Sequence, residues 1–481
     1  MNATIRRSAW MMGLLILVLI INANVLAVVR DDALRARDGN RRQIIDEYGH
    51  QRGSILVGRR AIAKSVSTDQ RLDYLRTYSD GSLYAPATGY YSIYGSTGIE
   101  SYENDVLTGD DDRLFVDRLT NLFTGQQPQG GNIVLTLDAD AQRAAYQGLD
   151  GQAGAVVALD PFTGAILALV SVPSFDPNLL ASHDPAQVTK NYDRLREDPD
   201  SPLLNRATQQ LYPPGSLFKV VVAAAALESG KYRPDAPLIP APAVLDLPDT
   251  TAVIRNYDGA PCFGGRASLT QALAISCNTA FANVGMDLGD DALRKQAEAF
   301  GFNKSVDTPL PVVPSVYPSD LDTPQTAQSA IGQYDVRASV MQMAMVGAGV
   351  ANGGAVMQPY LVAEEQAPDL SSLSVTEPEQ LSRAVSPSVA GALTDMMVGV
   401  VTNGTGVNAA IPGITVAGKT GTAEDGSRRP PHVWFMSFAP AEDPQVAVAV
   451  IVENGGRLGY DATGGAVAAP IARAVMEAVL Q

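Results

Sequence analysis

The 481-residue chain has few of the side chains from which metal sites and histidine-based catalytic centres are built. Its two cysteines, Cys262 and Cys277, are too few for a disulfide-rich scaffold or for a metal site made of cysteine. Its three histidines are scattered, and none has the context of a zinc ligand or of a Ser-His-Asp triad: His50, His183 and His432. We therefore expect neither a metal ion nor another cofactor.

Basic residues are also scarce, with 35 lysines and arginines against 51 aspartates and glutamates. The net charge of −16 argues against nucleic acid as a partner, because phosphates and an acidic protein repel each other. Residues 1–42 are the exception, since they carry seven arginines and only three aspartates. The positive charge of the chain is thus concentrated around its N-terminal apolar stretch.

That stretch runs from Ser8 to Val29 without a charged residue. About 20 apolar residues are enough for a helix to cross a bilayer. The stretch exceeds the core of a signal peptide, and no clear Ala-x-Ala cleavage site follows it, so we expect a retained anchor in the plasma membrane. Arg6 and Arg7 favour a cytoplasmic N-terminus, although five arginines on the far side weaken this argument. Residues 1–29 are predicted to be a short cytoplasmic tail and a transmembrane helix.

The remainder divides into two parts. Residues 30–130 are rich in turn formers, which predicts short strands and loops in a spacer or docking module. Residues 131–481 contain a strand hairpin at 155–170 and three further strand patterns after residue 414. Strands at both ends of this part and helical patterns in its middle predict an α+β domain whose sheet joins the two ends.

A buried helix is predicted after the sequence Tyr-Pro-Pro-Gly at 212–215, where Ser216 opens an apolar run that reaches Leu227. Lys219 stands one turn after Ser216 and shares its helix face, so its amine can reach the serine hydroxyl. Burial and the helix N-terminus favour a neutral lysine, which is a general base able to activate the serine. Alone, such a pair is a weak signal, because it also arises by chance on solvated helices.

A second constellation, Ser276-Cys277-Asn278, follows a short helical pattern at 269–275. Its serine can relay a proton to a leaving amine, and its asparagine amide can hold a substrate carbonyl and the first lysine. Alone, this tripeptide is more typical of a turn or a strand edge than of a site.

A third constellation lies on the strand that begins at Ile414. It supplies a fixed positive charge, two hydroxyl groups and a glycine that lets a ligand approach the backbone: Lys419, Thr420, Thr422 and Gly421. The charged, turn-rich segment 424–431 that follows is expected to form a rim of the site.

The order Ser-x-x-Lys, Ser-x-Asn, Lys-Thr-Gly is similar to the signature of penicillin-binding proteins and serine β-lactamases. Two early blocks, Arg52–Leu56 and Gly98–Tyr102, resemble those of monofunctional class B penicillin-binding proteins, and the cysteine in the second motif resembles actinobacterial members. The resemblance implies an antiparallel five-stranded sheet flanked by helices and an all-helical subdomain. It also implies that residues 30–130 form a small pedestal or dimerisation-like domain.

The activity that this resemblance implies is D,D-transpeptidation of peptidoglycan stem peptides, with penicillin acylating the same serine. Ser216 would be the nucleophile, Lys219 the base, Ser276 the proton relay and Asn278 the group that orients the donor peptide. The terminal carboxylate of the donor would be bound by Lys419, Thr420 and Thr422. Expected partners are D-Ala-D-Ala donors, amine acceptors, β-lactams, a membrane-bound glycan polymerase and divisome proteins.

Three other interpretations share parts of this pattern. A serine β-lactamase needs a base for water, but the stretch from Thr279 to Ala297 contains no glutamate. A membrane-anchored β-lactam sensor usually has a cytoplasmic signalling domain, and only about seven residues precede the apolar stretch here. A non-catalytic divisome scaffold predicts a decayed site, whereas every motif residue is present.

The two cysteines are also expected to pair. Cys262 lies 15 positions before Cys277, across a glycine-rich loop, and the catalytic domain is expected outside the cytoplasm, where disulfides persist. The alternative is two buried thiols.

Overall fold

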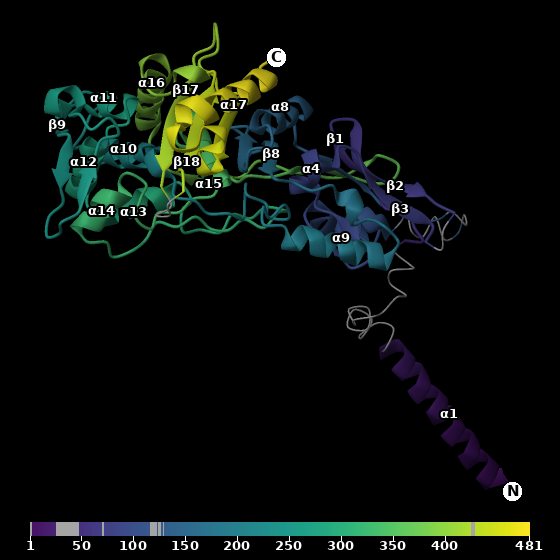
Figure 1. The fold of residues 1–481 in the computed structure, drawn as a ribbon. Helices are drawn as coiled ribbons and strands as arrows, with labels where there is room; N and C mark the ends of the chain where they lie inside the picture. Colours follow the sequence, from purple (N-terminus) through teal and green to yellow (C-terminus); the bar gives the residue numbers. More distant parts are fainter. Residues whose placement is uncertain are drawn as a thin grey trace.

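The computed structural model describes residues 2–25, 48–69, 72–115, 123, 127, 129–424 and 429–481. One antiparallel sheet has five strands in the order β17-β18-β19-β7-β8. The first two strands in the sequence form the predicted hairpin, and the other three come from near the C-terminus (Figure 1). The prediction that both ends of the domain share one sheet is confirmed. The bounds are β7 Gly154–Leu159, β8 Ile166–Val172, β17 Ala417–Ala423, β18 His432–Ala439 and β19 Val446–Val452.

Helices cover both faces of this sheet. On one face, α8 (Ala139–Leu149) and α17 (Gly464–Val479) pack against each other and against alternate residues of the strands. On the other face, α15 (Val340–Ala351) packs against the strand residues whose side chains point away from α8 and α17. Because successive side chains of a strand point to opposite faces, every residue of β18 and β19 is buried.

A helical region lies beside the sheet and carries the first two motifs (Figure 1). Its centre is α10, which packs against α12, α13 and α16. Nine of the ten α10 residues are buried, in agreement with the apolar sequence of this segment. The bounds are α10 Lys219–Glu228, α11 Leu269–Ala274, α12 Asn278–Leu288, α13 Asp290–Ala299, α14 Thr323–Ser329 and α16 Pro387–Asn403.

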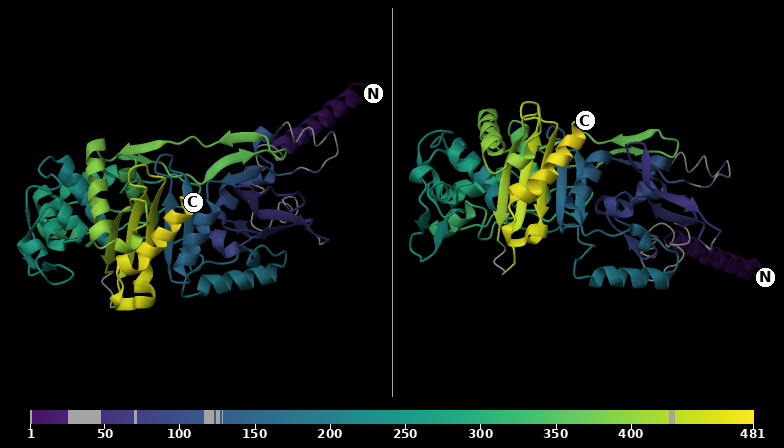
Figure 2. Two further views of the ribbon diagram at one scale, coloured as in Figure 1. Left: turned by 90° about the horizontal axis from the view of Figure 1, so that it is seen from above. Right: turned by 45° about the horizontal axis from the view of Figure 1, so that its top comes forward.

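The N-terminal part is built on a second sheet of six strands in the order β15-β14-β6-β1-β2-β3. Its strands β14 and β15 come from far later in the sequence, and Figure 2 shows the arm that carries them reaching to the early strands. This sheet therefore crosses the sequence division expected at residue 130. Its bounds are β1 Ile55–Val57, β2 Arg60–Ser67, β3 Tyr74–Tyr78, β6 Asn132–Leu135, β14 Val362–Gln366 and β15 Ser372–Val375.

The two early blocks that resemble class B proteins meet in a buried ion triad. Glu100 accepts from Arg52 Nε at 2.8 Å, from Arg76 Nε at 2.6 Å and from the Tyr78 hydroxyl at 2.9 Å. Burial alone would raise the pKa of Glu100, but Arg76 and Arg52 lower it below its usual value. The carboxylate therefore stays ionised. It links Arg76 on β3 to Arg52, which precedes β1 of the same sheet.

Replacing Glu100 by alanine should lower the free energy of unfolding by about 3–5 kcal/mol, because two guanidinium groups would stay buried without a counter-charge. Arg60→Ala is a matched control, since it breaks the Arg60–Asp80 pair, whose side chains are about half exposed. That change should cost only about 0.2–1 kcal/mol. Urea unfolding measures the free energy of unfolding of both variants. Equal losses of this free energy would contradict a structural role of the triad.

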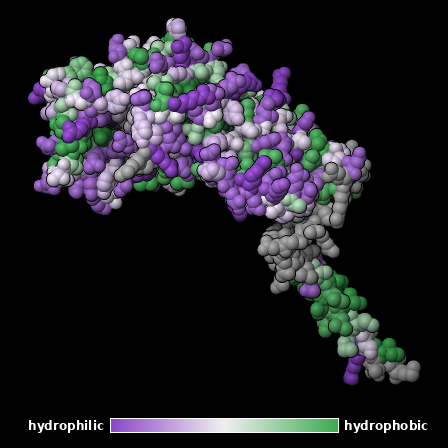
Figure 3. All heavy atoms as spheres, in the orientation of Figure 1, coloured by the Kyte–Doolittle hydropathy of each residue, from purple (hydrophilic) through white to green (hydrophobic). Residues whose placement is uncertain are grey.

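The N-terminal helix α1 (Asn2–Asn24) stands apart from both sheets (Figure 1). Its residues Ile5–Asn24 are long and apolar enough to cross a membrane, and none of them is buried. Apolar side chains cover its surface, as Figure 3 shows. Residues 26–29 of the predicted span and 30–47 of the predicted pedestal lie outside the described part of the chain.

Candidate active site

Ser216 lies where the chain turns into helix α10. The preceding Gly215 has a φ of +53°, which favours glycine, and a Cβ there would lie 2.6 Å from the carbonyl oxygen of Thr422. Residues 215–218 form a 3-10 turn (η4), and α10 begins at Lys219. The sequence predicted Ser216 as the first helical residue, whereas the structure places it in this turn, packed against β17.

Lys219 is fully buried and donates to three oxygens of the second motif. Its Nζ lies 2.7 Å from Ser276 O, 3.2 Å from Ser276 Oγ and 2.6 Å from Asn278 Oδ1. The Ser216 hydroxyl, its expected partner, is not among its hydrogen bonds in the described chain, because these three acceptors hold the amine. In catalytic sites such bonds often become short only when substrate binds.

Ser276 connects the three constellations. Its hydroxyl lies within hydrogen-bond distance of Lys219 Nζ and, at 2.9 Å, of Lys419 Nζ. The residue has a φ of +61°, a conformation that costs a non-glycine residue free energy and that clusters at functional sites. Asn278 also donates its amide to the carbonyl of Arg255 at 2.8 Å, which fixes its orientation toward Lys219. Lys219 and Lys419 thus meet at the Ser276 hydroxyl, and Asn278 is joined to them through Lys219.

Burial determines the charge of both lysines. Burial lowers the pKa of Lys219 well below its usual value, and the nearby charge of Lys419 lowers it further. Burial also lowers the pKa of Lys419 to about 7. Lys219 is therefore suited to act as a neutral base at neutral pH. The positive charge of Lys419, expected from the sequence to be fixed, depends on pH instead.

The affinity for a β-lactam with a free carboxylate should consequently weaken as the pH rises above about 7. Lys419 loses its proton there, and the protonated fraction falls by up to about tenfold per pH unit. Initial binding of penicillin G can be measured by stopped-flow acylation at several pH values. Its methyl ester is the control, because it has no carboxylate for Lys419 to attract. A pH dependence identical for acid and ester would contradict the role of this charge.

Close packing of glycines holds β17 in place. A Cβ on Gly421 would lie 2.5 Å from Leu217 Cδ1 and 3.0 Å from Trp434 Cβ. The sequence interpretation gave this glycine the role of admitting a ligand; it lines the cleft and is also in close contact with η4 and β18. Gly464, at the start of α17, was missed by sequence reasoning, although a Cβ there would overlap the Trp434 carbonyl oxygen and approach the Gly421 backbone.

Gly464→Ala should lower the rate of penicillin acylation by about 10–100-fold, because it displaces β17 from η4 and so separates the groups of the site. The clash is with backbone atoms, which cannot rotate away. Gly399→Ala in α16 is the control, since a Cβ there meets nothing within 4 Å. Equal acylation rates of the two variants would show that Gly464 does not position the site.

Asn256 is a buried support of the second motif that the sequence did not reveal. Its Oδ1 accepts from the backbone N–H groups of Asn278 and Thr279, both at 3.1 Å. Its amide donates to Pro242 O at 3.0 Å and to Ala260 O at 2.9 Å. The surrounding Asn-Tyr-Asp-Gly looks like an ordinary turn, so no local signal marks this residue.

A disulfide supports the same turn. Cys262 and Cys277 are bonded, as the sequence analysis expected, with their Cα atoms 6.3 Å apart. The bond ties the short turn Cys262–Gly265 to the residue that precedes α12. Cys277 lies between Ser276 and Asn278, so the bridge restrains both motif residues.

The motifs open into one cleft of about 620 Å³. Because β17 is the edge strand of its sheet, the cleft offers a backbone edge to an extended peptide. Of the expected rim segment, Glu424 and Pro431 line the cleft, while 425–428 are outside the described residues. The lining contains Ser216, Ser276, Asn278, Thr420, Gly421 and Thr422 from the predicted set, and Arg255, Tyr257 and Tyr460 from outside it.

Two protein-family models match this chain. Residues 154–477 match the penicillin binding protein transpeptidase domain. Residues 52–133 match the penicillin binding protein A dimerisation domain. Together the two matches cover the five-stranded sheet, most of the six-stranded sheet and the cleft.

Individual proteins are similar over almost the whole chain. The peptidoglycan D,D-transpeptidase PbpA of Mycolicibacterium smegmatis is 50% identical over 499 aligned residues, which cover 100% of this chain and 99% of the relative. Penicillin-binding protein A of M. tuberculosis, solved as a ceftriaxone acyl-enzyme complex, has a TM-score of 0.88 and 47% identity over 91% of this chain and 100% of that one. Its penicillin G acyl-enzyme has a TM-score of 0.86 and 47% identity over 90% and 100%.

Proposed function

The chain belongs to the penicillin-binding protein transpeptidase family, and from this membership we propose a role for each residue of the cleft. The protein is a peptidoglycan D,D-transpeptidase that β-lactams acylate. The observation that supports the assignment of roles best is the Ser276 hydroxyl, which lies within hydrogen-bond distance of both buried lysines. This hydroxyl can pass the proton that Lys219 takes from the attacking serine on to the leaving amine.

In the first half-reaction, Ser216 Oγ attacks the carbonyl carbon of the penultimate D-alanine. Lys219, neutral because it is buried, takes the hydroxyl proton. The backbone N–H groups of Ser216 and Thr422 stabilise the oxyanion. When the peptide bond breaks, Ser276 passes the proton to the departing amine of the terminal D-alanine, and an ester to Ser216 remains.

The third motif holds the donor peptide. Lys419, when protonated, attracts the terminal carboxylate, while the hydroxyls of Thr420 and Thr422 donate to it. Asn278 orients the peptide carbonyl. In the second half-reaction an acceptor amine attacks the ester, a new peptide bond forms, and Ser216 regains its proton through Lys219.

The chain outside the cleft has an anchoring role in this proposal. Helix α1 holds the protein in the plasma membrane with residues 1–29 as tail and anchor and the N-terminus in the cytoplasm. Residues 30–130 then form a pedestal that raises the catalytic domain, residues 131–481, above the membrane. The partners of the protein there are a membrane-bound glycan polymerase, which supplies the glycan strands to be cross-linked, and divisome proteins.

Retention of a fluorescent penicillin tests this function. We expect labelling that survives gel electrophoresis and is lost only slowly after excess probe is removed, because the ester needs an amine acceptor. A β-lactamase would lose the label within a few turnovers, and a non-catalytic scaffold would stay dark. Either result would overturn the assignment.

A further inference from the structure

A second pocket of about 240 Å³ lies at the junction of the two parts of the chain. One side is built by α4 (Gly81–Thr88) and by residues 89–98 of the N-terminal part, and the other side by residues 171–209 and by 310–311. The two sides are joined by Asn205, whose amide donates to the carbonyl oxygen of Pro86 at 2.9 Å. The pocket shares no lining residue with the catalytic cleft, so it is a separate site.

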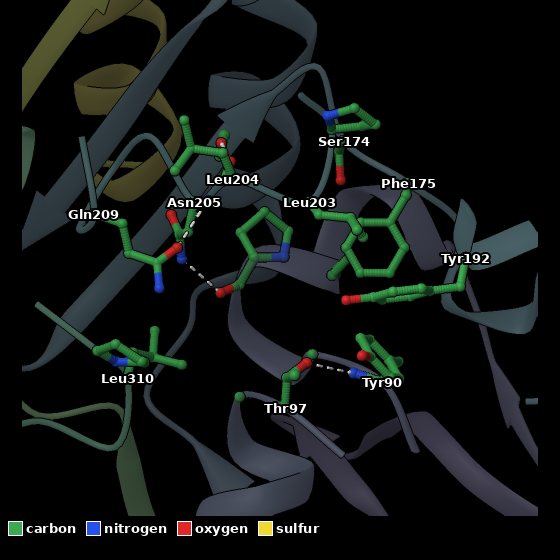
Figure 4. A pocket seen from close by; sticks show the side chains of 17 residues that line it. Tyr90, Thr97, Ser174, Phe175, Tyr192, Leu203, Leu204, Asn205, Gln209 and Leu310 are labelled. Atoms are coloured by element: carbon green, nitrogen blue, oxygen red, sulfur yellow. Dashed lines mark hydrogen bonds between the residues drawn. The ribbon is translucent and has the colours of Figure 1, made fainter. Parts of the chain in front are cut away.

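The lining of this pocket, which we call the junction pocket, carries no charged residue. Figure 4 shows the rings of Phe175, Tyr192 and Tyr90 gathered on one side, with Gln209 and Leu310 on the other. The Tyr90 and Phe175 rings are 6.1 Å apart in an edge arrangement. A wall of aromatic rings without charge selects a neutral ligand that has an apolar face.

Polar groups in the junction pocket have hydrogen bonds left to make. The hydroxyl of Ser174 is buried and has no partner among the described residues, and Figure 4 shows it directed between Phe175 and Leu203. Gln209 accepts at its Oε1 from the backbone N–H of Asn205 at 3.3 Å, while its amide nitrogen bonds to no described residue. A buried hydroxyl without a partner is unfavourable, so a ligand group that reached it would form a hydrogen bond that the protein itself does not supply.

We propose that the junction pocket binds one acetamido sugar ring of the glycan strand. A pyranose ring presents a face of C–H groups to aromatic rings, and its hydroxyls and acetamido group can bond to Ser174 and Gln209. The volume is below the roughly 300–1,000 Å³ of pockets for drug-sized ligands, so it suits a single ring. The identity of the ligand rests on the proposed function, because peptidoglycan combines neutral amino sugars with charged peptides.

Saturation-transfer NMR of the full-length protein in detergent micelles, titrated with N,N′-diacetylchitobiose, tests the proposal. We expect saturable binding with the strongest transfer to the acetamido methyl groups. Tyr192→Ala should weaken it about tenfold, because the ring forms one wall of the pocket. Ser174→Ala should weaken it less, and Tyr102→Ala, an exposed tyrosine outside the pocket, should leave it unchanged.

Cellobiose, which has the same rings without acetamido groups, is the ligand control. Absence of saturable chitobiose binding, equal binding of cellobiose, or equal binding by native protein and Tyr192→Ala would each overturn the proposal. Penicillin labelling of the same samples distinguishes a failure of the sugar-binding proposal from a failure of the catalytic assignment. Labelled protein that fails to bind the sugar refutes the junction pocket alone, whereas unlabelled native protein refutes the catalytic assignment.

Discussion

Ser216→Ala is expected to abolish covalent attachment of penicillin. The alanine has no oxygen with which to form the acyl ester, and the other hydroxyls of the cleft are not placed to replace it. Ser276 is held by two lysines and lies on the turn before α12, so its oxygen cannot take the position of Ser216. The measurement is the mass of the intact protein after incubation with excess penicillin G. Native protein should gain one penicillin mass and the variant none.

The fold should survive this change, because the Ser216 side chain makes no hydrogen bond within the described chain. Ser276→Ala is the matched control, since it removes a hydroxyl of the same site but leaves the nucleophile. It should slow acylation by about 10²–10⁴-fold, the usual contribution of a positioned proton carrier, and still give full labelling at long times. Full labelling of Ser216→Ala would mean that another nucleophile carries the reaction.

Lys219→Met is expected to lower the acylation rate by about 10²–10⁴-fold, because it removes the base and keeps the length and apolar stem of the side chain. The amine also holds Ser276 and Asn278 through three hydrogen bonds. Part of the loss in acylation rate therefore comes from these two residues losing their fixed positions. The rate in native protein should rise with pH through the lowered pKa of Lys219, since only the neutral amine accepts a proton. Rapid-mixing fluorescence with a labelled penicillin measures both effects.

The variant Lys219→Arg distinguishes a role of Lys219 as a general base from a role as a positive charge. Arginine keeps hydrogen-bond donors at this position but stays protonated, so it cannot accept the serine proton. The variant should be as slow as Lys219→Met, and its rate should lack the rise with pH that the neutral amine of Lys219 gives the native protein. Thermal unfolding checks that the larger side chain is accommodated. An arginine variant that acylates at the native rate would show that Lys219 acts only as a positive charge.

Local sequence patterns were enough to propose the groups of the site, because the chemistry of each motif depends on short spacings. The one-turn separation of Ser216 and Lys219 and the apolar run around them placed a lysine in a buried helix. The proline-rich segment and Gly215 predicted a helix start at Ser216, whereas α10 begins three residues later, at Lys219. The close approach of Gly215 to the backbone of Thr422 could not be predicted, because the two residues are about 200 positions apart in the sequence.

Supports from distant segments were missed for the same physical reason. Asn256 and Gly464 have ordinary local sequences, and their importance lies in contacts with Asn278, Trp434 and the backbone of Gly421. The strand β14 likewise pairs with β6 across a separation that no local periodicity reveals. A single sequence specifies such pairings only through the complete fold.

The most direct test of the central claim is to locate the penicillin adduct in the native protein by mass spectrometry of its peptides. The account predicts a single adduct on the peptide that contains Ser216 and Lys219, attached at the serine oxygen. An adduct on Ser276, on a threonine of β17 or on any residue outside the cleft would contradict it.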